Sequence, residues 1–211
     1  MAIKNIVFDV GGVFAIWQPK AIFRKYFKTE ADVEKFMKEI DFEGMNSKGD
    51  LGISVSALSK EIAEKFPQYA EAILAYDRDW LDTITNEIDG TKDLVGELKK
   101  NGYKIYILSN WESDKFRLFD SKYKILDMAD GYIISGDIKK VKPFAEIYNA
   151  LTQKYNLKGE ECVFLDDRLE NVEGAKNVGW QAILFKDAKS AEVDLQKLGV
   201  KTNCFVKNKN R

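Results

Sequence analysis

The sequence contains no histidine among its 211 residues. Serine and cysteine nucleophiles that depend on a histidine base are therefore excluded, and so is a zinc ion bound by histidine. Any chemistry in this chain has to use carboxylates, lysines, hydroxyl groups, backbone amides or a metal ion bound by oxygen atoms.

Cysteine is almost as rare, and long apolar runs are missing. Cys162 and Cys204 lie far apart without metal-ligand spacing, and Cys162 opens an apolar run, which predicts a buried thiol. No apolar stretch approaches the length of a membrane span, and Asp9 interrupts the first one too early for a signal peptide. We therefore expect a cytoplasmic protein that does not bind membranes.

Neither sign of charge dominates, because 33 basic residues face 34 acidic ones. Such a chain has no overall field that would attract nucleic acid, so we expect no nucleic-acid partner. No surface stripe stands apart from the expected packing to indicate the oligomeric state. We expect a monomer or a weak dimer.

Hydrophobic periodicity divides the chain into two kinds of structure. Residues 3–8 form a β-branched and aromatic run that ends at an aspartate, which is typical of a buried strand. From about residue 17 to residue 81, apolar residues recur at helical intervals, and nothing there alternates as a strand does. We therefore expect a helical subdomain at residues 15–85, inserted into a core made of residues 1–14 and 86–211.

Strand–helix alternation resumes after this helical segment. We expect strands at 103–108, 131–134, 162–165 and 182–185, and helices at 91–100, 114–120, 143–155, 170–177 and 190–198. This alternation predicts an α/β core of the Rossmann-like kind, with a doubly wound and mostly parallel sheet that helices cover on both faces.

Polar side chains follow the strands of the predicted sheet. They are Asp9 after the first strand, Ser109-Asn110 after the second, Asp166-Asp167 after a later one, and Lys142 before a helix. Each of them alone is more often a turn, cap or surface residue. In an open parallel sheet, however, ligands bind outside the carboxyl ends of the strands. The same edge would bring these residues together.

Together these residue types suit a phosphate and a magnesium ion. Carboxylates and carbonyl oxygens are the ligands that magnesium prefers, and a carboxylate can also attack phosphorus. Ser109, Asn110 and Lys142 would supply donors and positive charge to phosphoryl oxygens. Gly11 and Gly12 have no side chains, so their backbone N–H groups can approach a phosphate closely.

At these positions the sequence resembles the haloacid dehalogenase superfamily, and in particular its branch of small phosphatases with a helical cap. The family motifs are a strand ending in a nucleophilic Asp, a Ser or Thr after a hydrophobic strand, a Lys commonly followed by Pro, and an acidic pair. In that order they match residues 6–13 (IVFDVGGV), 107–111 (ILSNW), 141–143 (VKP) and 164–168 (FLDDR). These matches span nearly the whole chain.

The resemblance implies a nucleophile and a metal site. Asp9 would attack phosphorus and bind Mg²⁺ through one oxygen, with the Gly11 carbonyl as a second ligand. Asp167 would be the principal acidic ligand of the last motif, and Asp166 would bind directly or through water. Which member of this pair is the closer ligand is left open by the sequence.

The resemblance also implies how the substrate is held. Ser109 and Lys142 would bind the transferring phosphoryl group, and Lys142 would offset the charge of the crowded carboxylates. The segment 15–85 would be the cap that closes over the site and selects a small phosphorylated metabolite.

One departure from the family pattern affects the chemistry. Most family phosphatases have a second Asp, two residues after the nucleophile, which protonates the leaving group; here this residue is Gly11. A branch that includes sugar-1-phosphate phosphatases shares this glycine, although its often acidic position 16 is Ile16 here. General acid catalysis contributes ~10²–10⁴ in rate. We therefore expect a preference for good leaving groups, as in anomeric sugar, aryl or acyl phosphates.

Three other functions are compatible with parts of the pattern. A 2-haloacid dehalogenase needs no metal, and the acidic pair would repel its substrate carboxylate. A phosphomutase generally needs an acid or base at position 11, where this chain has glycine. A binding protein that has lost the chemistry is favoured by Gly11, whereas the intact Asp9, Ser109, Lys142 and Asp167 argue for an active enzyme.

Overall fold

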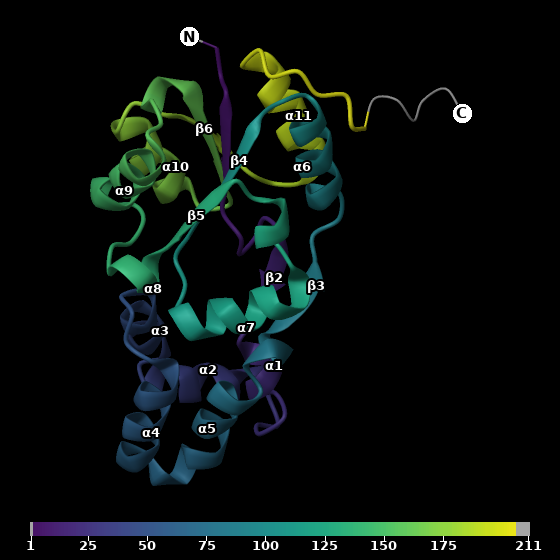
Figure 1. The fold of residues 1–211 in the computed structure, drawn as a ribbon. Helices are drawn as coiled ribbons and strands as arrows, with labels where there is room; N and C mark the ends of the chain where they lie inside the picture. Colours follow the sequence, from purple (N-terminus) through teal and green to yellow (C-terminus); the bar gives the residue numbers. More distant parts are fainter. Residues whose placement is uncertain (1, 206–211) are drawn as a thin grey trace.

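The computed structural model describes residues 2–205, and its centre is a five-stranded parallel sheet (Figure 1). The strand order is β5-β4-β1-β6-β7. The strands are β1 (Asn5–Phe8), β4 (Lys104–Ser109), β5 (Gly131–Ile134), β6 (Cys162–Asp166) and β7 (Gln181–Leu184). All of β1 is buried, because this strand lies in the middle of the sheet with a parallel neighbour at each edge.

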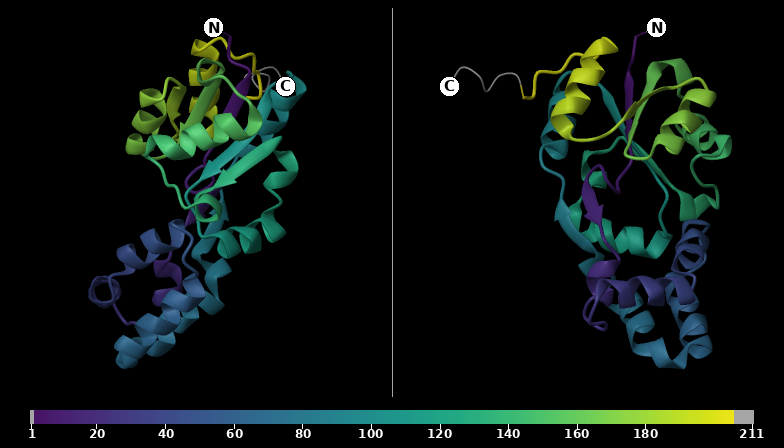
Figure 2. Two further views of the ribbon diagram at one scale, coloured as in Figure 1. Left: turned by 60° about the vertical axis from the view of Figure 1, so that its left-hand side comes forward. Right: turned by 180° about the vertical axis from the view of Figure 1, so that it is seen from behind.

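Helices cover both faces of this sheet. They are α6 (Thr91–Lys100), α7 (Ser113–Tyr123), α8 (Ser135–Ile138), α9 (Ala145–Tyr155), α10 (Leu169–Asn177) and α11 (Ala188–Lys197). Side chains alternate along a strand, so Ile6 packs with residues of α6 and α11 while Val7 packs with residues of α9 and α10. In Figures 1 and 2, α6 and α11 (teal and yellow) lie on one side of the sheet and α9 and α10 (green) on the other. The expected doubly wound α/β core is confirmed.

The strands and helices expected after residue 90 are all present, with ends that differ by three residues or fewer. Their periodic apolar positions pack where the pattern predicts: Leu94 and Leu98 of α6 are buried, and so are Ile147 and Leu151 of α9. The short helix α8 was not expected, because four residues carry no helical period.

Between β1 and the rest of the sheet, the chain forms a group of helices. They are α1 (Lys20–Phe23), α2 (Glu30–Glu39), α3 (Phe42–Asp50), α4 (Val55–Lys65) and α5 (Ala70–Arg78), with 3₁₀ segments at Pro67–Tyr69 and Trp80–Thr83. Their core is aromatic, since the ring of Phe23 lies 5.0 Å from that of Phe36 and 5.4 Å from that of Phe42. Figure 1 shows these helices (purple to blue) beyond the carboxyl ends of the parallel strands.

A two-stranded antiparallel ribbon connects these helices to the core. It consists of β2 (Ala15–Trp17) and β3 (Ile84–Glu87). The prediction that residues 17–81 contain no strand is wrong at its first residue, since Trp17 is the last residue of β2. Strands of three or four residues are too short to show a period of two, and their partners are distant in sequence. None of the helices in the described part of the chain has the length and apolar character needed to cross a membrane.

Candidate active site

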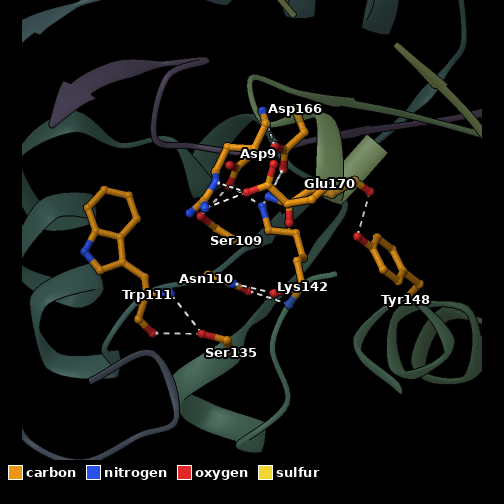
Figure 3. Close-up of polar contacts among 11 residues, drawn as sticks. Asp9, Ser109, Asn110, Trp111, Ser135, Lys142, Tyr148, Asp166 and Glu170 are labelled. Carbon is orange, nitrogen blue, oxygen red and sulfur yellow. Dashed lines mark hydrogen bonds and ion pairs between the residues drawn. The ribbon is translucent and has the colours of Figure 1, made fainter. Parts of the chain in front are cut away.

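The carboxyl ends of three neighbouring strands bring the predicted polar residues together (Figure 3). Asp9 follows β1 directly, Ser109 is the last residue of β4, and Asp166 is the last residue of β6. Because β1 lies between β4 and β6, the three side chains meet although they are far apart in sequence. Lys142 reaches the same point from the loop before α9.

Lys142 is held between two carboxylates. Its Nζ lies 2.8 Å from Oδ1 of Asp9 and 2.6 Å from Oδ2 of Asp166, and only 1% of its side chain is exposed. Burial lowers the pKa of Lys142, but the charges of Asp9 and Asp166 outweigh burial and raise the pKa above its ordinary value. The lysine therefore stays positively charged, which stabilises the two carboxylates and leaves positive charge beside Asp9.

Asp9 is buried and has two donors on one oxygen. The hydroxyl of Ser109 donates to Oδ1 over 2.6 Å, and Lys142 contacts the same oxygen. Burial raises the pKa of Asp9 to about 7; the charge of Asp166 adds to this rise, and Lys142 and Ser109 oppose it. A cation beside Asp9 would favour the ionised form, which is the form that can act as a nucleophile.

The two members of the acidic pair have different surroundings. Asp166 is buried, and its oxygens accept from Lys142, from the backbone N–H of Arg168 (2.8 Å) and from the Asn171 amide (3.0 and 3.1 Å). Asp167 is exposed and makes no side-chain hydrogen bond to another described residue. Loss of hydration and the nearby charge of Asp166 raise the pKa of Asp167. Asp167 thus has the freer oxygens for a metal ion.

These carboxylates fit a magnesium ion. One oxygen each from Asp9, Asp166 and Asp167 lie within 4.8 Å of one another, and oxygen donors of this kind are what magnesium takes in proteins. Gly12 makes the cluster possible: its φ is +70°, and a Cβ there would lie 2.1 Å from Oδ2 of Asp167. At Gly11, in contrast, a Cβ would meet nothing within 4 Å.

Asn110 positions the loop that carries Lys142. Its Nδ2 donates to the carbonyl of Lys142 over 3.1 Å, and its Oδ1 accepts from the backbone N–H of Lys142 over 2.8 Å. Both ends of the amide are therefore engaged by one residue. The amide therefore fixes where the lysine lies, and the contact of Asn110 with phosphate stays a prediction.

Two further residues belong to this site and were not predicted from the sequence. Asn171, on α10, holds both oxygens of Asp166, and Tyr148 in turn donates to the carbonyl of Asn171 over 2.8 Å. Asp50, at the end of α3, lines the same cavity as Asp9. Burial raises the pKa of Asp50 to about 7. The sequence could have indicated Asn171, because this residue lies within about one helical turn of the acidic pair. No pattern in the sequence indicated that Asp50 belongs to the site.

The polar residues form the floor of a cavity of about 310 Å³. Asp9, Ser109, Lys142 and Asp167 line it from the ends of the strands and the loop before α9. Gly11 also lines the cavity, so its missing side chain leaves space beside the nucleophile. The remaining walls come from the ribbon, from the helices between β2 and β3, and from the loop after β4.

Comparison with known proteins assigns the family. A family model described as a haloacid dehalogenase-like hydrolase matches residues 3–179. The chain belongs to this family. The residues matched include Asp9, Ser109, Lys142 and the acidic pair, and they span both the helices before β3 and most of the α/β core.

Two curated relatives of this haloacid dehalogenase-like hydrolase are phosphatases. The chain is 25% identical over 200 residues to the sesquiterpene phosphatase astK of Aspergillus oryzae, covering 92% of this chain and 96% of the relative. It is 28% identical over 156 residues to a glyceraldehyde 3-phosphate phosphatase of Pyrococcus furiosus, covering 66% of this chain and 65% of the relative. The protein is a haloacid dehalogenase-like phosphatase, a hydrolase of phosphate esters.

A solved structure supports the same fold. The enzyme BT-2542 of Bacteroides thetaiotaomicron, an aspartate-to-alanine mutant in complex with magnesium and inorganic phosphate, aligns with a TM-score of 0.70 at 22% identity. The alignment covers 88% of this chain and 95% of that structure. The arrangement of sheet and helices described above is therefore that of a haloacid dehalogenase-like enzyme.

Proposed function

We propose that this phosphatase is a magnesium-dependent phosphomonoesterase that works through an aspartyl-phosphate on Asp9. The observation that carries the proposal is the position of Asp9 in the wall of a cavity, with Ser109 and Lys142 on one oxygen and two further carboxylates beside it. The complex of BT-2542 with magnesium and phosphate supports the choice of ligands.

The reaction divides into two displacements. The Asp9 carboxylate attacks phosphorus and forms the aspartyl-phosphate, while the bond from phosphorus to the leaving oxygen breaks and that oxygen takes a proton. A water molecule then attacks phosphorus and releases phosphate, and Asp9 regains its carboxylate. Ser109 and Lys142 donate to the phosphoryl oxygens in both steps.

The metal ligands follow from the donors that are present. Asp9, Asp167 and the Gly11 carbonyl would bind Mg²⁺, and Asp166 would bind directly or through water. When bound, the ion supplies positive charge to the phosphoryl oxygens. Asp166 already accepts hydrogen bonds from Lys142 and Asn171, so its task is also to orient the lysine.

Residues 15–85 are proposed to act as a cap that closes the cavity and selects the substrate. The cavity walls contributed by Trp17, Asp50 and Tyr76 support this assignment. The substrate is proposed to be a small phosphorylated metabolite, because the two relatives described above are phosphatases, one named for sesquiterpenes and the other for glyceraldehyde 3-phosphate. The protein is proposed to act in the cytoplasm.

Hydrolysis of acetyl phosphate tests the proposal, because this small compound has a good leaving group and needs few contacts with the cap. We expect phosphate release that depends on Mg²⁺ and is abolished in Asp9→Asn. The exposed Asp194→Asn on α11 is the matched control and should keep full activity. Absence of turnover in the wild-type protein would favour a binding protein instead, and halide release from a 2-haloacid in EDTA would favour a dehalogenase.

Gly11→Asp tests how the leaving group is protonated. The new side chain would enter open space in the cavity, where a Cβ meets no atom within 4 Å. We expect kcat/KM to rise about 10-fold or more for alkyl phosphates, whose alkoxides need a proton, and to change little for acetyl phosphate. Equal effects on both substrates would contradict the proposed lack of a general acid.

A further inference from the structure

The outer wall of the active-site cavity is largely apolar and aromatic. It is formed by Ile16, Trp17, Val55, Tyr76, Trp80 and Trp111. The proposed phosphate-binding residues line the cavity from the ends of the strands, so a leaving group would extend from there toward this wall. Its chemistry therefore bears on the alcohol part of the substrate.

The aromatic side chains of this wall are held in place by their neighbours. Trp111 lies 5.6 Å from Trp80 and 4.9 Å from Phe119 between ring centroids, and Tyr76 lies 5.0 Å from Phe42. Rings that are already packed lose little conformational freedom when a ligand binds. The wall is thus a pre-formed surface for apolar contact.

The cations around the cavity are already paired with acidic groups. Lys115 contacts the Asp77 carboxylate at 2.5 Å and the Asp77 carbonyl at 2.9 Å, and Arg168 pairs with Glu170. Lys142, the third cation that lines the cavity, contacts Asp9 and Asp166. Among the described residues that line the cavity, a second phosphate or a carboxylate on the substrate would therefore have to compete with Asp77 for Lys115 and with Glu170 for Arg168.

Acidic groups line the outer part of the cavity as well. Glu112 and Asp50 both contribute to its wall. These carboxylates, whenever they are ionised, would repel a negative charge on the substrate. An uncharged leaving group avoids this repulsion.

Few hydrogen-bonding groups remain available to a sugar ring. Glu112 already accepts from the backbone N–H of Lys115 over 2.7 Å. Within the described chain, the side chains of Asn46 and Asp50 make no hydrogen bond to another residue, and the Nε1–H of Trp17 is buried without an acceptor, so these are the groups that remain available. A sugar would place several hydroxyl groups against apolar walls, and each unpaired hydroxyl costs binding free energy.

We infer that the leaving group is a small, uncharged alcohol or phenol with an apolar or aromatic body and at most one or two polar atoms. The inference rests on the proposed phosphatase function and names the substrate class of that site. The cavity volume of about 310 Å³ lies at the lower end of the range for small-molecule sites, so the body is about the size of one substituted ring or a short branched chain.

Two alkyl phosphates with similarly basic leaving groups test the substrate class. 2-Phenylethyl phosphate has the inferred aromatic body, whereas glycerol 3-phosphate has two free hydroxyl groups. Glucose 6-phosphate and 3-phosphoglycerate, which also release a primary alcohol, extend the comparison to a sugar and to a second anion. With Mg²⁺ present, we expect kcat/KM for 2-phenylethyl phosphate to exceed that for glycerol 3-phosphate, glucose 6-phosphate and 3-phosphoglycerate by at least 10-fold.

Variants of the wall provide the second arm of this test. Trp17→Ala should lower the ratio of kcat/KM for 2-phenylethyl phosphate to that for acetyl phosphate by about 10-fold, and Trp17→Phe should restore most of it. Val55→Thr keeps the shape of the side chain and adds a hydroxyl to the wall, so it should lower the same ratio. Val193→Ala, on the exposed face of α11, is the control and should leave the ratio unchanged.

The possible results distinguish a failure of the proposed function from a failure of the inferred substrate class. If acetyl phosphate is not hydrolysed, the proposed function fails. If acetyl phosphate is hydrolysed and glycerol 3-phosphate, glucose 6-phosphate or 3-phosphoglycerate is turned over as well as 2-phenylethyl phosphate, only the substrate class is overturned. A ratio that Trp17→Ala leaves unchanged, in a variant with a native circular-dichroism melting curve, would also overturn it.

Discussion

At the scale of single residues, the site depends on charged side chains that lie very close to one another and to the backbone of the nucleophile loop. The ammonium group of Lys142 separates the carboxylates of Asp9 and Asp166, which would otherwise repel each other in a buried place. Gly12 lets Asp167 come close to the nucleophile loop. The sequence predicted that Asp9, Ser109 and Lys142 share one site, because each follows or precedes a recognisable element. It did not predict that Asn110 holds the Lys142 loop, since this depends on the path of that loop.

The two adjacent glycines should respond differently to alanine. A Cβ at Gly12 would lie 2.1 Å from Oδ2 of Asp167, at a φ of +70° that alanine adopts poorly, whereas a Cβ at Gly11 meets no atom within 4 Å. We expect Gly12→Ala to weaken Mg²⁺ binding at least 10-fold, because Asp167 has to move. Gly11→Ala should change Mg²⁺ binding less than threefold. Isothermal titration of both variants with MgCl₂ compares them, and equal affinities would contradict this account of Gly12.

At the scale of elements, the end of α3 is docked against the core. The hydroxyl of Ser135, at the start of α8, donates to the carbonyl of Asp50 over 2.7 Å and accepts from the backbone N–H of Trp111. A Cβ at Gly52 would lie 2.4 Å from the carbonyl of Gly136, so the loop after α3 also lies directly on the core. This docking brings Asp50 into the cavity and removes part of its hydration.

The pH dependence of stability should report the burial of Asp50. Its pKa is raised from 3.8 to about 7, so between these values the folded protein binds a proton that the unfolded chain has lost. Stability contributed by this site therefore falls as pH rises through that interval. We compare the unfolding free energies of Asp50→Asn and wild type in EDTA. The value for the variant minus that for the wild type should increase by roughly 1–3 kcal/mol between pH 5 and pH 8.

Urea unfolding at the two pH values measures this difference. Asp9 also has a raised pKa, so it too makes the unfolding free energy decrease as pH rises. Only the difference between the variant and the wild type therefore reports Asp50 alone. Asp187→Asn, which replaces the capping carboxylate of α11 by a capping amide, is the control and should show no comparable growth with pH. A constant difference between Asp50→Asn and wild type would show that Asp50 is ionised in the folded protein at pH 5.

At the scale of the whole molecule, the sheet gathers carboxylates that the unfolded chain keeps far apart. Three acidic side chains from two strand ends lie close enough together to bind one metal ion. One lysine offsets part of their negative charge. Folding therefore builds a site for a divalent cation, and binding of that cation has to stabilise the folded protein. The cavity above this site opens between the core and the helices that precede β3.

Magnesium should raise the unfolding free energy through this site. At an Mg²⁺ concentration 100 times the dissociation constant, we expect a gain of about 2.7 kcal/mol over the same protein in EDTA. Asp167→Asn should remove most of the gain, and the exposed Asp194→Asn should retain it. Chemical unfolding with and without Mg²⁺ measures the effect, and an equal gain in Asp167→Asn would place the ion elsewhere.

The sequence by itself determined the class of fold and the residues at the strand ends. Buried strands, amphipathic helices and strand-end polar residues are local patterns, and the rule that ligands bind at the carboxyl ends of parallel strands joins them into one site. The absence of histidine by itself excluded histidine-activated nucleophiles and histidine-bound zinc. Strand–helix alternation was therefore sufficient to bring Asp9 and Asp166 together.

Only the tertiary structure decided which residues face the leaving group. The β2–β3 ribbon pairs strands that are distant in sequence, and the wall with Trp17, Trp80 and Trp111 combines the ribbon, the segment after α5 and the loop after β4. Asp50 reaches the cavity because the end of α3 docks on α8. Local periodicity carries no information on such contacts, since their free energy comes from packing between segments that the chain brings together only when it folds.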